Sequence, residues 1–151
     1  MMRSILAFLA FAAFANAQAF SFRIGAPVAS QDFQFKSAAF VFRTEGCAGV
    51  EKLKITAAAV GRVNGERRSM DLHVAASSSH PGVFAVAQQW PQEGNWVVSL
   101  KGECGDKIAG AIVPLNRQGF IRESAKFFSR AAKDSEIDAA LKDLAKKEEP
   151  K

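Results

Sequence analysis

Apolar and polar residues alternate on both sides of an Asn64-Gly65 pair between residues 53 and 76. Asn-Gly is a strong signal for a two-residue hairpin turn, because both central positions tolerate positive φ. Folding the chain about this turn sets the register. One face then pairs apolar residues only, namely Ala59 with Met70, Ala57 with Leu72, Ile55 with Val74 and Leu53 with Ala76. The other face pairs Thr56 with His73 and Ala58 with Asp71, a mixed surface of the kind that meets water.

Two further hairpins follow from the same alternation. Pro91 and Gly94 suit a turn across residues 91–95 that pairs Trp90 with Trp96. The shared face then consists of Phe84, Val86, Trp90, Trp96, Val98 and Leu100, with Gln88 as its one polar exception. Gly105-Asp106 predicts a two-residue turn that sets Leu100 against Ala111, Val98 against Val113 and Trp96 against Leu115. Both turns select the same inner face for residues 96–100, as expected of one consistent fold.

Shorter alternating segments precede these hairpins, around Phe40 and Phe42, at residues 20–24 and at residues 33–35. Six or seven short strands with regularly spaced turns predict an all-β fold. A small β-sandwich over residues 33–116 is favoured, with a barrel as the alternative. The chain has 151 residues, which is enough for one domain with a modest core but not for two.

The pattern changes to helical spacing after Asn116. Residues 135–147 begin with Ser135 as the N-cap and carry acidic residues in the first turn and lysines in the last. They bear a narrow apolar stripe at Ile137, Leu141 and Leu144. Residues 117–151 are therefore expected to form a linker and a short C-terminal α-helix, which is docked weakly or awaits a partner.

Residues 1–17 have the layout of a secretory signal peptide. Arg3 precedes an apolar run that is too short to span a bilayer. The small residues at 15 and 17 mark a cleavage site after Ala17, with cleavage after Ala19 as the alternative. We therefore expect an exported protein, periplasmic or secreted, that is soluble after cleavage.

Export changes how the only two cysteines, Cys47 and Cys104, are interpreted. In an oxidising compartment an even pair predicts one structural disulfide. The positions of the two residues, one in the loop after the strand around Phe40 and one at a hairpin tip, predict a bridge that clamps loops at one end of the sandwich. Such a bridge does not cross the core as in antibody domains.

Composition and motifs exclude several function classes. Lys and Arg number 20 against 15 Asp and Glu, but these charges are scattered, so no nucleic-acid partner is expected of an exported protein. The sequence contains no G-x-S-x-G, H-E-x-x-H, C-x-x-C or phosphate-loop motif. Residues 77–79 before His80 are interpreted as a polar loop rather than part of a hydrolase triad. We expect no enzymatic activity and no catalytic residue.

The spaced motif Gly82-x-Phe84-x5-Trp90-Pro91-x2-Gly94-x-Trp96-x-Val98-x-Leu100 resembles the closing hairpin of YtkA-like domains. These domains are small exported immunoglobulin-like modules associated with copper handling and membrane oxidases. The resemblance covers residues 38–115 at most. It implies that the sandwich is immunoglobulin-like, and it implies that copper ligands should be present.

Copper sites of this kind use histidine, methionine and carboxylate ligands. Asp71 and His73 are expected to project from the same outward face of one strand, whereas Met70 points inward. The resemblance therefore makes Asp71 and His73, together with His80, the candidate copper ligands. The alternative is a surface Asp-His pair that holds no metal.

Residues 120–131 combine three phenylalanines with three cations, namely Phe120, Phe127 and Phe128 with Arg122, Lys126 and Arg130. If this segment is helical, the two sets lie on opposite sides, a pattern that can rest on an anionic membrane surface. We favour a linker whose phenylalanines dock on the sandwich while the cations face water.

The sequence as a whole predicts a non-catalytic exported binding or accessory module, a monomer whose protein partner in the envelope is unidentified. Two alternatives remain open. One is a periplasmic copper-binding accessory protein. The other is an envelope-surface structural protein that acts through the basic aromatic tail.

Overall fold

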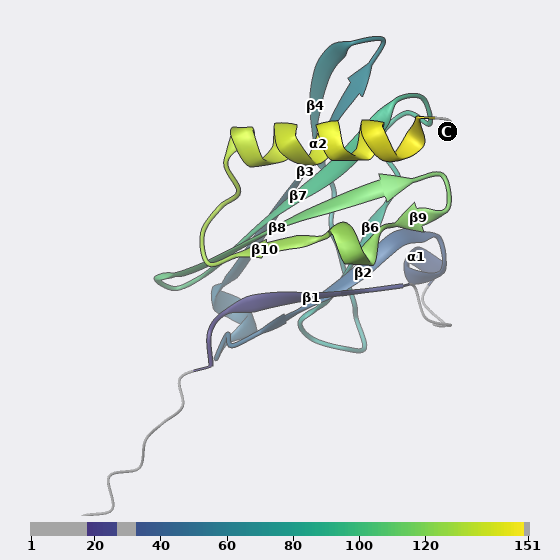
Figure 1. Ribbon diagram of the computed structural model, residues 1–151. Coiled ribbons are helices and arrows are strands. Elements are labelled where there is room, and N and C mark those ends of the chain that lie inside the picture. The colour runs from purple at the N-terminus through teal and green to yellow at the C-terminus, as the bar shows by residue number, and fades with distance from the viewer. Residues whose placement is uncertain (1–17, 27–32, 150–151) are drawn as a thin grey trace, which may run out of the picture.

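The computed structural model describes residues 18–26 and 33–149, which form two antiparallel β-sheets and a C-terminal helix in three layers (Figure 1). The strands in this part of the chain are β1 (Ser21–Gly25), β2 (Ala38–Glu45), β3 (Leu53–Val63), β4 (Glu66–Leu72), β5 (Ala75–Ala76), β6 (Val83–Ala87), β7 (Asn95–Cys104), β8 (Lys107–Asn116), β9 (Gly119–Phe120) and β10 (Lys126–Phe128). The helices are α1 (Phe33–Lys36) and α2 (Asp134–Glu148), with 3₁₀ turns η1 (Val50–Lys52) and η2 (Arg122–Ser124). The predicted leader, residues 1–17, lies outside the described residues.

The two sheets differ in size. Sheet A has the strand order β1-β2-β6-β5, and sheet B has the order β10-β8-β7-β3-β4, with β9 also paired to β8. The predicted class, an all-β sandwich with a short C-terminal helix, is confirmed. The sheets extend beyond residues 33–116, because β1, β9 and β10 belong to them.

The two hairpins with two-residue turns have the predicted register where they pair. Ala57 faces Leu72 and Ala59 faces Met70 between β3 and β4. Between β7 and β8, Trp96 faces Leu115, Val98 faces Val113 and Leu100 faces Ala111. In these two hairpins, the turn residues and the alternation were sufficient to set the register.

The β3–β4 pairing ends earlier than predicted. The expected pairs Thr56–His73, Ile55–Val74 and Leu53–Ala76 do not form, because β4 ends at Leu72 and the chain crosses to sheet A, where Ala76 pairs with Phe84. The Gln89 side chain holds the chain at this crossing. Its Oε1 accepts the His73 backbone N–H at 2.8 Å and its Nε2 donates to the His73 carbonyl at 2.9 Å.

The predicted Trp90–Trp96 hairpin is wrong. β6 lies in sheet A and β7 in sheet B, so residues 88–94 carry the chain from one sheet to the other. The inward side chains were nevertheless identified correctly, since Val86, Trp90, Trp96 and Val98 are all buried. Strict alternation gives the same inner face whether two strands are neighbours or face each other across the core.

Phenylalanine rings fill the sheet A side of the core. The Phe22 ring meets the Phe42 ring edge-on with centroids 5.6 Å apart, and the Phe84 ring stacks on Phe42 at 5.2 Å. Sheet B contributes smaller side chains opposite them, among them Ala57, Ala59, Val98, Leu100, Ala111 and Val113. Residues 33–36 form the one-turn helix α1 beside β2 and β6 instead of the expected pairing segment.

Helix α2 packs closely on the outer face of sheet B, so the expectation of a weakly docked helix is wrong (Figure 1). The predicted stripe Ile137, Leu141 and Leu144 is buried there together with Ala140, against Val60, Val97 and Ile112 of the sheet. The helix begins two residues earlier than the predicted N-cap implies. Lys133, not Ser135, is the N-cap, and its backbone N–H donates to the Glu136 carboxylate at 2.8 Å.

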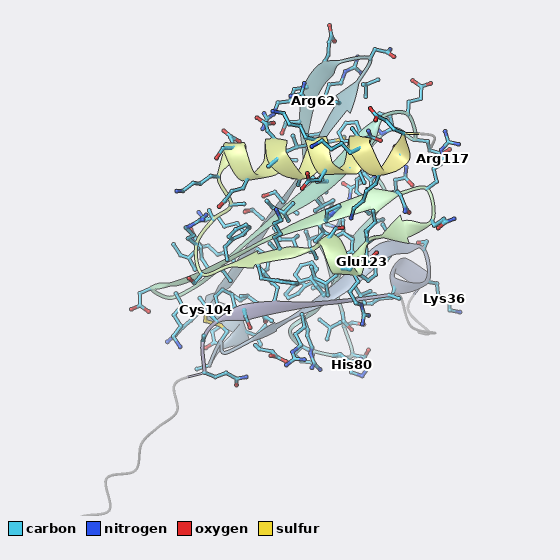
Figure 2. All side chains as sticks on the ribbon, viewed as in Figure 1. Lys36, Arg62, His80, Cys104, Arg117 and Glu123 are labelled. Atoms are coloured by element: carbon cyan, nitrogen blue, oxygen red, sulfur yellow. A yellow bond between two sulfur atoms is a disulfide. The ribbon has the colours of Figure 1, made fainter. Side chains whose placement is uncertain are left out.

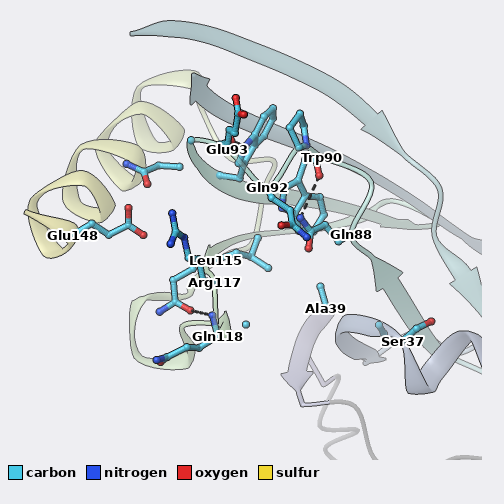
Figure 3. Close-up of a pocket in the computed structure, with 17 residues that line it drawn as sticks. Ser37, Ala39, Gln88, Trp90, Gln92, Glu93, Leu115, Arg117, Gln118 and Glu148 are labelled. Atoms are coloured by element: carbon cyan, nitrogen blue, oxygen red, sulfur yellow. Dashed lines mark hydrogen bonds between the residues drawn. The ribbon is translucent and has the colours of Figure 1, made fainter. Parts of the chain in front are cut away.

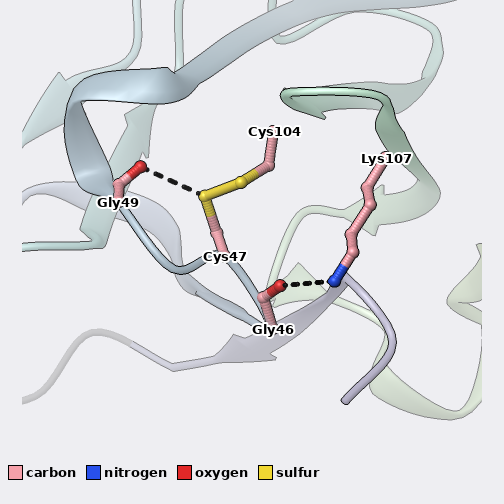
Figure 4. Close-up of a disulfide and its surroundings, with 5 residues drawn as sticks. All are labelled: Gly46, Cys47, Gly49, Cys104 and Lys107. Carbon is pink, nitrogen blue, oxygen red and sulfur yellow. Dashed lines mark hydrogen bonds between the residues drawn. A yellow bond between two sulfur atoms is a disulfide. The ribbon is translucent and has the colours of Figure 1, made fainter. Parts of the chain in front are cut away.

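Cys47 and Cys104 form the predicted disulfide, with their Cα atoms 5.8 Å apart (Figure 4). Cys47 lies on the crossover from β2 in sheet A to β3 in sheet B, and Cys104 is the last residue of β7. Lys107 Nζ donates to the Gly46 carbonyl at 3.5 Å beside the bridge. The bridge therefore joins the two layers at one end of the sandwich.

Candidate functional site

An open cavity of about 1040 Å³ lies at one end of the sandwich (Figure 3). Its wall is formed by the first residues of β2 and β7, the crossover at 88–94, the end of β8 with its turn into β9, and the last turn of α2. Arg117 of this cavity and the bridging Cys104 lie at opposite ends of the molecule (Figure 2). The disulfide therefore closes one end of the sandwich and the cavity opens at the other.

Two tryptophans form the base of the cavity. Trp90 and Trp96 both line it, yet they are only 8% and 4% exposed, because most of each ring is packed into the core. The indole Nε1–H of Trp96 donates to the Glu93 carbonyl at 2.8 Å, which fixes the orientation of that ring. These tryptophans therefore belong to the core and also provide an apolar base for the cavity.

Two glycines permit this arrangement. Gly61 is the register partner of Trp96, and a Cβ at Gly61 would overlap the indole ring. Gly94 has a φ of 84° at the end of the crossover, and its Cα faces the Arg62 carbonyl so closely that a side chain would collide with it. The crossover can therefore lie against β3 only because residue 94 lacks a side chain.

Five carboxamide side chains surround this base, from Gln88, Gln92, Asn95, Asn116 and Gln118. Two of them serve the local backbone. Gln88 Nε2 donates to the Trp90 carbonyl at 3.3 Å, and Asn116 Oδ1 accepts the Gln118 backbone N–H at 2.8 Å. The side chains of Gln92, Asn95 and Gln118 make no hydrogen bond to any other described residue. Three carboxamides, from three different segments, are thus available to a ligand.

Three charged groups complete the lining, the carboxylates of Glu93 and Glu148 and the guanidinium of Arg117. None of the three forms a salt bridge with another described residue. Glu93 belongs to the crossover, Arg117 to the turn after β8 and Glu148 to the end of α2. Helix α2 therefore contributes to the cavity as well as covering sheet B.

The candidate copper ligands lie elsewhere. Asp71 lies on β4, and His73 is the first residue after that strand; both side chains are exposed. His80 lies in the exposed loop between β5 and β6 (Figure 2). Within residues 18–26 and 33–149, no three His, Cys, Asp or Glu side chains are grouped so that they could hold a metal ion. A copper site on Asp71, His73 and His80 stays a prediction.

The loop before His80 contains short-range polar contacts. Ser79 Oγ lies 3.0 Å from His80 Nδ1, and the His80 backbone N–H donates to Ser77 Oγ at 3.1 Å. These contacts close a turn that consists of the half-buried Ser77 and three exposed residues. Residues 77–80 therefore form a polar loop, as the sequence predicts.

Residues 119–128 form no α-helix, because they consist of β9, the 3₁₀ turn η2 and β10 with short connections. Phe120 packs against the main core and Phe128 packs against the cluster under α2, while Phe127 is 51% exposed. The Arg130 guanidinium lies 4.8 Å from the centre of the Phe128 ring. Phe120 and Phe128 are thus docked as the favoured interpretation of this segment expects, whereas the exposed Phe127 is not. None of the described helices is long and apolar enough to cross a bilayer.

Sequence reasoning missed the cavity because its lining comes from segments far apart in the chain. A signal was nevertheless present. Residues 88–95 contain five carboxamide or carboxylate side chains around Trp90, namely Gln88, Gln89, Gln92, Glu93 and Asn95. Comparison of the chain with family models, with curated proteins and with solved structures found no match.

Proposed function

We propose that this protein is a non-catalytic exported binding module whose ligand occupies the carboxamide-lined cavity. The observation that carries the proposal is the cavity itself, about 1040 Å³ in volume, with an apolar base and uncommitted hydrogen-bonding side chains around it. Ligand sites are typically concave, of roughly 300–1,000 Å³, and combine apolar surface with a few polar groups that orient the ligand. This cavity lies just above the upper end of that range.

The proposal includes an immunoglobulin-like topology. If β1 to β8 are named A, B, C, C′, D, E, F and G in chain order, sheet A has the order A-B-E-D and the main part of sheet B has the order G-F-C-C′. This is the arrangement of immunoglobulin-like sandwiches with one added C′ strand. The cavity then lies at the end opposite the B–C and F–G loops, where the disulfide is found. Fold alone does not define function, so the argument for binding rests on the cavity.

The chemistry of the lining supports binding rather than catalysis. Carboxamides donate and accept hydrogen bonds but do not ionise near neutral pH, so they do not serve as general acids or bases. Carboxamides are the most common side-chain type in the lining, with five of its 17 residues, and they lie over a base of tryptophan and leucine. Export is supported by the signal-peptide pattern of residues 1–17 and by the Cys47–Cys104 bridge, since such bridges persist in oxidising compartments.

The test uses a reporter that the protein already contains. Trp90 and Trp96 are the only tryptophans, the chain has no tyrosine, and both rings line the cavity, so intrinsic fluorescence reports on this site. The full chain with its disulfide intact would be titrated with separate pools of oligosaccharides, peptides, nucleotides and lipids. We expect at least one pool to shift the tryptophan emission and raise the melting temperature.

A cavity-blocking variant identifies where the ligand binds. In Gln118→Phe, the new ring lies at the mouth of the cavity and should abolish the shift. Asp106→Phe places the same ring in the exposed turn at the disulfide end and should leave the shift unchanged. If no pool changes the wild-type emission, or if Gln118→Phe responds as well as wild type, the proposed function is wrong.

A further inference from the structure

We infer that the carboxamide-lined cavity binds a neutral oligosaccharide. This inference rests on the proposed function and adds the class of ligand. Three properties of the lining carry it: the donor and acceptor pattern, the balance of charge, and the position of the cavity relative to the strands.

The first property is the pairing of donors and acceptors. A carboxamide presents an N–H₂ donor and a C=O acceptor side by side, whereas a carboxylate only accepts and an ammonium only donates. A sugar hydroxyl also donates and accepts, so two neighbouring hydroxyls can engage both halves of one carboxamide. Gln92, Asn95 and Gln118 project such groups from the crossover, from the start of β7 and from the β8–β9 turn. A ring placed between them can be held from several sides.

The second property is charge. Two carboxylates, Glu93 and Glu148, face one guanidinium, that of Arg117. A phosphorylated or acidic ligand would meet one cation and two like charges, which disfavours its binding. Carboxylates and guanidinium groups also form strong hydrogen bonds with hydroxyls, because charge-assisted bonds exceed neutral ones in strength. The charged groups therefore favour a neutral, hydroxyl-rich ligand.

The third property separates a saccharide from a peptide. Extended peptides are commonly bound by adding a strand to a free sheet edge. Where β7 and β8 reach the cavity, both are already paired on each side, because Trp96 faces Gly61 and Leu115, and Leu115 also faces Phe120. Among the described residues, the edges left free at the cavity are short, namely the two-residue strand β9 and the first residues of β2, which β1 does not reach, so a peptide strand has little edge to pair with.

The base suits a sugar ring. Trp90, Trp96 and Leu115 are only 8%, 4% and 6% exposed, so they offer a small apolar surface that C–H groups of a pyranose can contact, while the hydroxyls at the ring edge reach the carboxamides. A volume of about 1040 Å³ exceeds what one small ring needs, so a chain of several sugar units is expected.

The experiment titrates the full chain with cellohexaose, mannohexaose and chitohexaose as neutral probes, with hexagalacturonate as the acidic probe and with a neutral hexapeptide. Tryptophan emission gives the dissociation constant for each. The double variant Gln92→Ala, Gln118→Ala removes two uncommitted carboxamides. We expect one or more neutral hexasaccharides to bind and the double variant to weaken that binding by about tenfold or more, because each lost hydrogen bond contributes about a factor of five.

Asn64→Gly is the matched control. It removes an exposed carboxamide outside the cavity, and glycine accepts the φ of 51° that Asn64 adopts in its turn. This variant should bind the saccharide as wild type does. Circular dichroism and the melting temperature of all variants would show that the fold is unchanged.

The outcomes separate the two proposals. Binding of the hexapeptide or of hexagalacturonate, with the neutral saccharides inactive, overturns the ligand class and leaves the proposed function standing. Neutral saccharide binding that is equally strong in the double variant overturns this site as the saccharide site. If neither these probes nor any pool of the broader screen binds, the inference and the proposed function both fail.

Discussion

Gly61 is the residue whose replacement should disturb the base of the cavity most directly. It faces Trp96 across β3 and β7, and a Cβ at this position would overlap the indole ring. We expect Gly61→Ala to lower the free energy of unfolding by about 1–3 kcal/mol, because overpacking forces the ring off its rotamer. The displaced Trp96 ring should also shift the tryptophan emission of the folded protein. Urea unfolding followed by fluorescence measures both.

Gly25→Ala is the control for this change. Gly25 also lies in a strand, but a Cβ there would have no atom of the described residues within 4 Å, so the substitution should leave stability nearly unchanged. Equal unfolding midpoints for Gly61→Ala and wild type would show that the Trp96 ring is not confined by β3.

Burial of individual side chains could be predicted from the sequence, whereas the site could not. Trp96, Val98 and Leu100 are buried as expected, because a strand alternates its side chains between two faces. Gln88, the polar exception on the predicted inner face, is exposed and lines the cavity. Which loops meet at the end of a sandwich depends on long-range topology, and no local pattern contains that information.

At the scale of the elements, the strand pairing was predicted correctly where a two-residue turn joins the strands. It was predicted wrongly for β6 and β7, which a longer segment connects. Asn64-Gly65 and Gly105-Asp106 each form a two-residue turn, and these turns determine register by their own geometry. The segment between β6 and β7 is long enough to cross from one sheet to the other, so the same alternation fits two topologies. The fold class is unaffected by this ambiguity, but the position of the cavity depends on it.

The start of helix α2 should make stability sensitive to acid. Arg130 donates to the Glu136 carboxylate, and the Lys133 backbone N–H also donates to it, which lowers the pKa of Glu136 from 4.5 to about 2. Because the pKa is lower in the folded state, the unfolded state binds more protons between these values, and stability falls as the pH drops from about 4.5 toward 2. We expect Glu136→Gln to lose less stability than wild type over that window.

Urea midpoints at several pH values through the window would measure this difference. Arg130→Met is the companion variant, because it removes the cation and leaves Glu136 in place. It should flatten the pH dependence in the same direction as Glu136→Gln. Identical pH profiles for all three proteins would contradict a stabilising Arg130–Glu136 contact.

At the scale of the whole molecule, the sequence did not predict where helix α2, the third layer of the fold, packs. The stripe on α2 was visible, but its docking surface was not. That surface consists of Val60, Val97 and Ile112, which are apolar positions on the outward face of sheet B. Apolar residues on both faces of β3, β7 and β8 are the sign of a sheet covered on two sides, and they account for a helix that packs closely instead of weakly.

The disulfide connects the layers at the end remote from the cavity, and its removal should weaken the whole fold. Cys47 and Cys104 are separated by 57 positions in the chain, and closing a loop of that length stabilises the folded state by about 4 kcal/mol on the chain-entropy model. We expect the Cys47→Ala, Cys104→Ala double variant to lose stability of this order in guanidinium unfolding. Reductant should bring the wild type to the same midpoint and leave the double variant unchanged. Because the bridge ties the β2–β3 crossover to the end of β7, a wild type equally stable with and without reductant would mean that core packing alone holds the two sheets together.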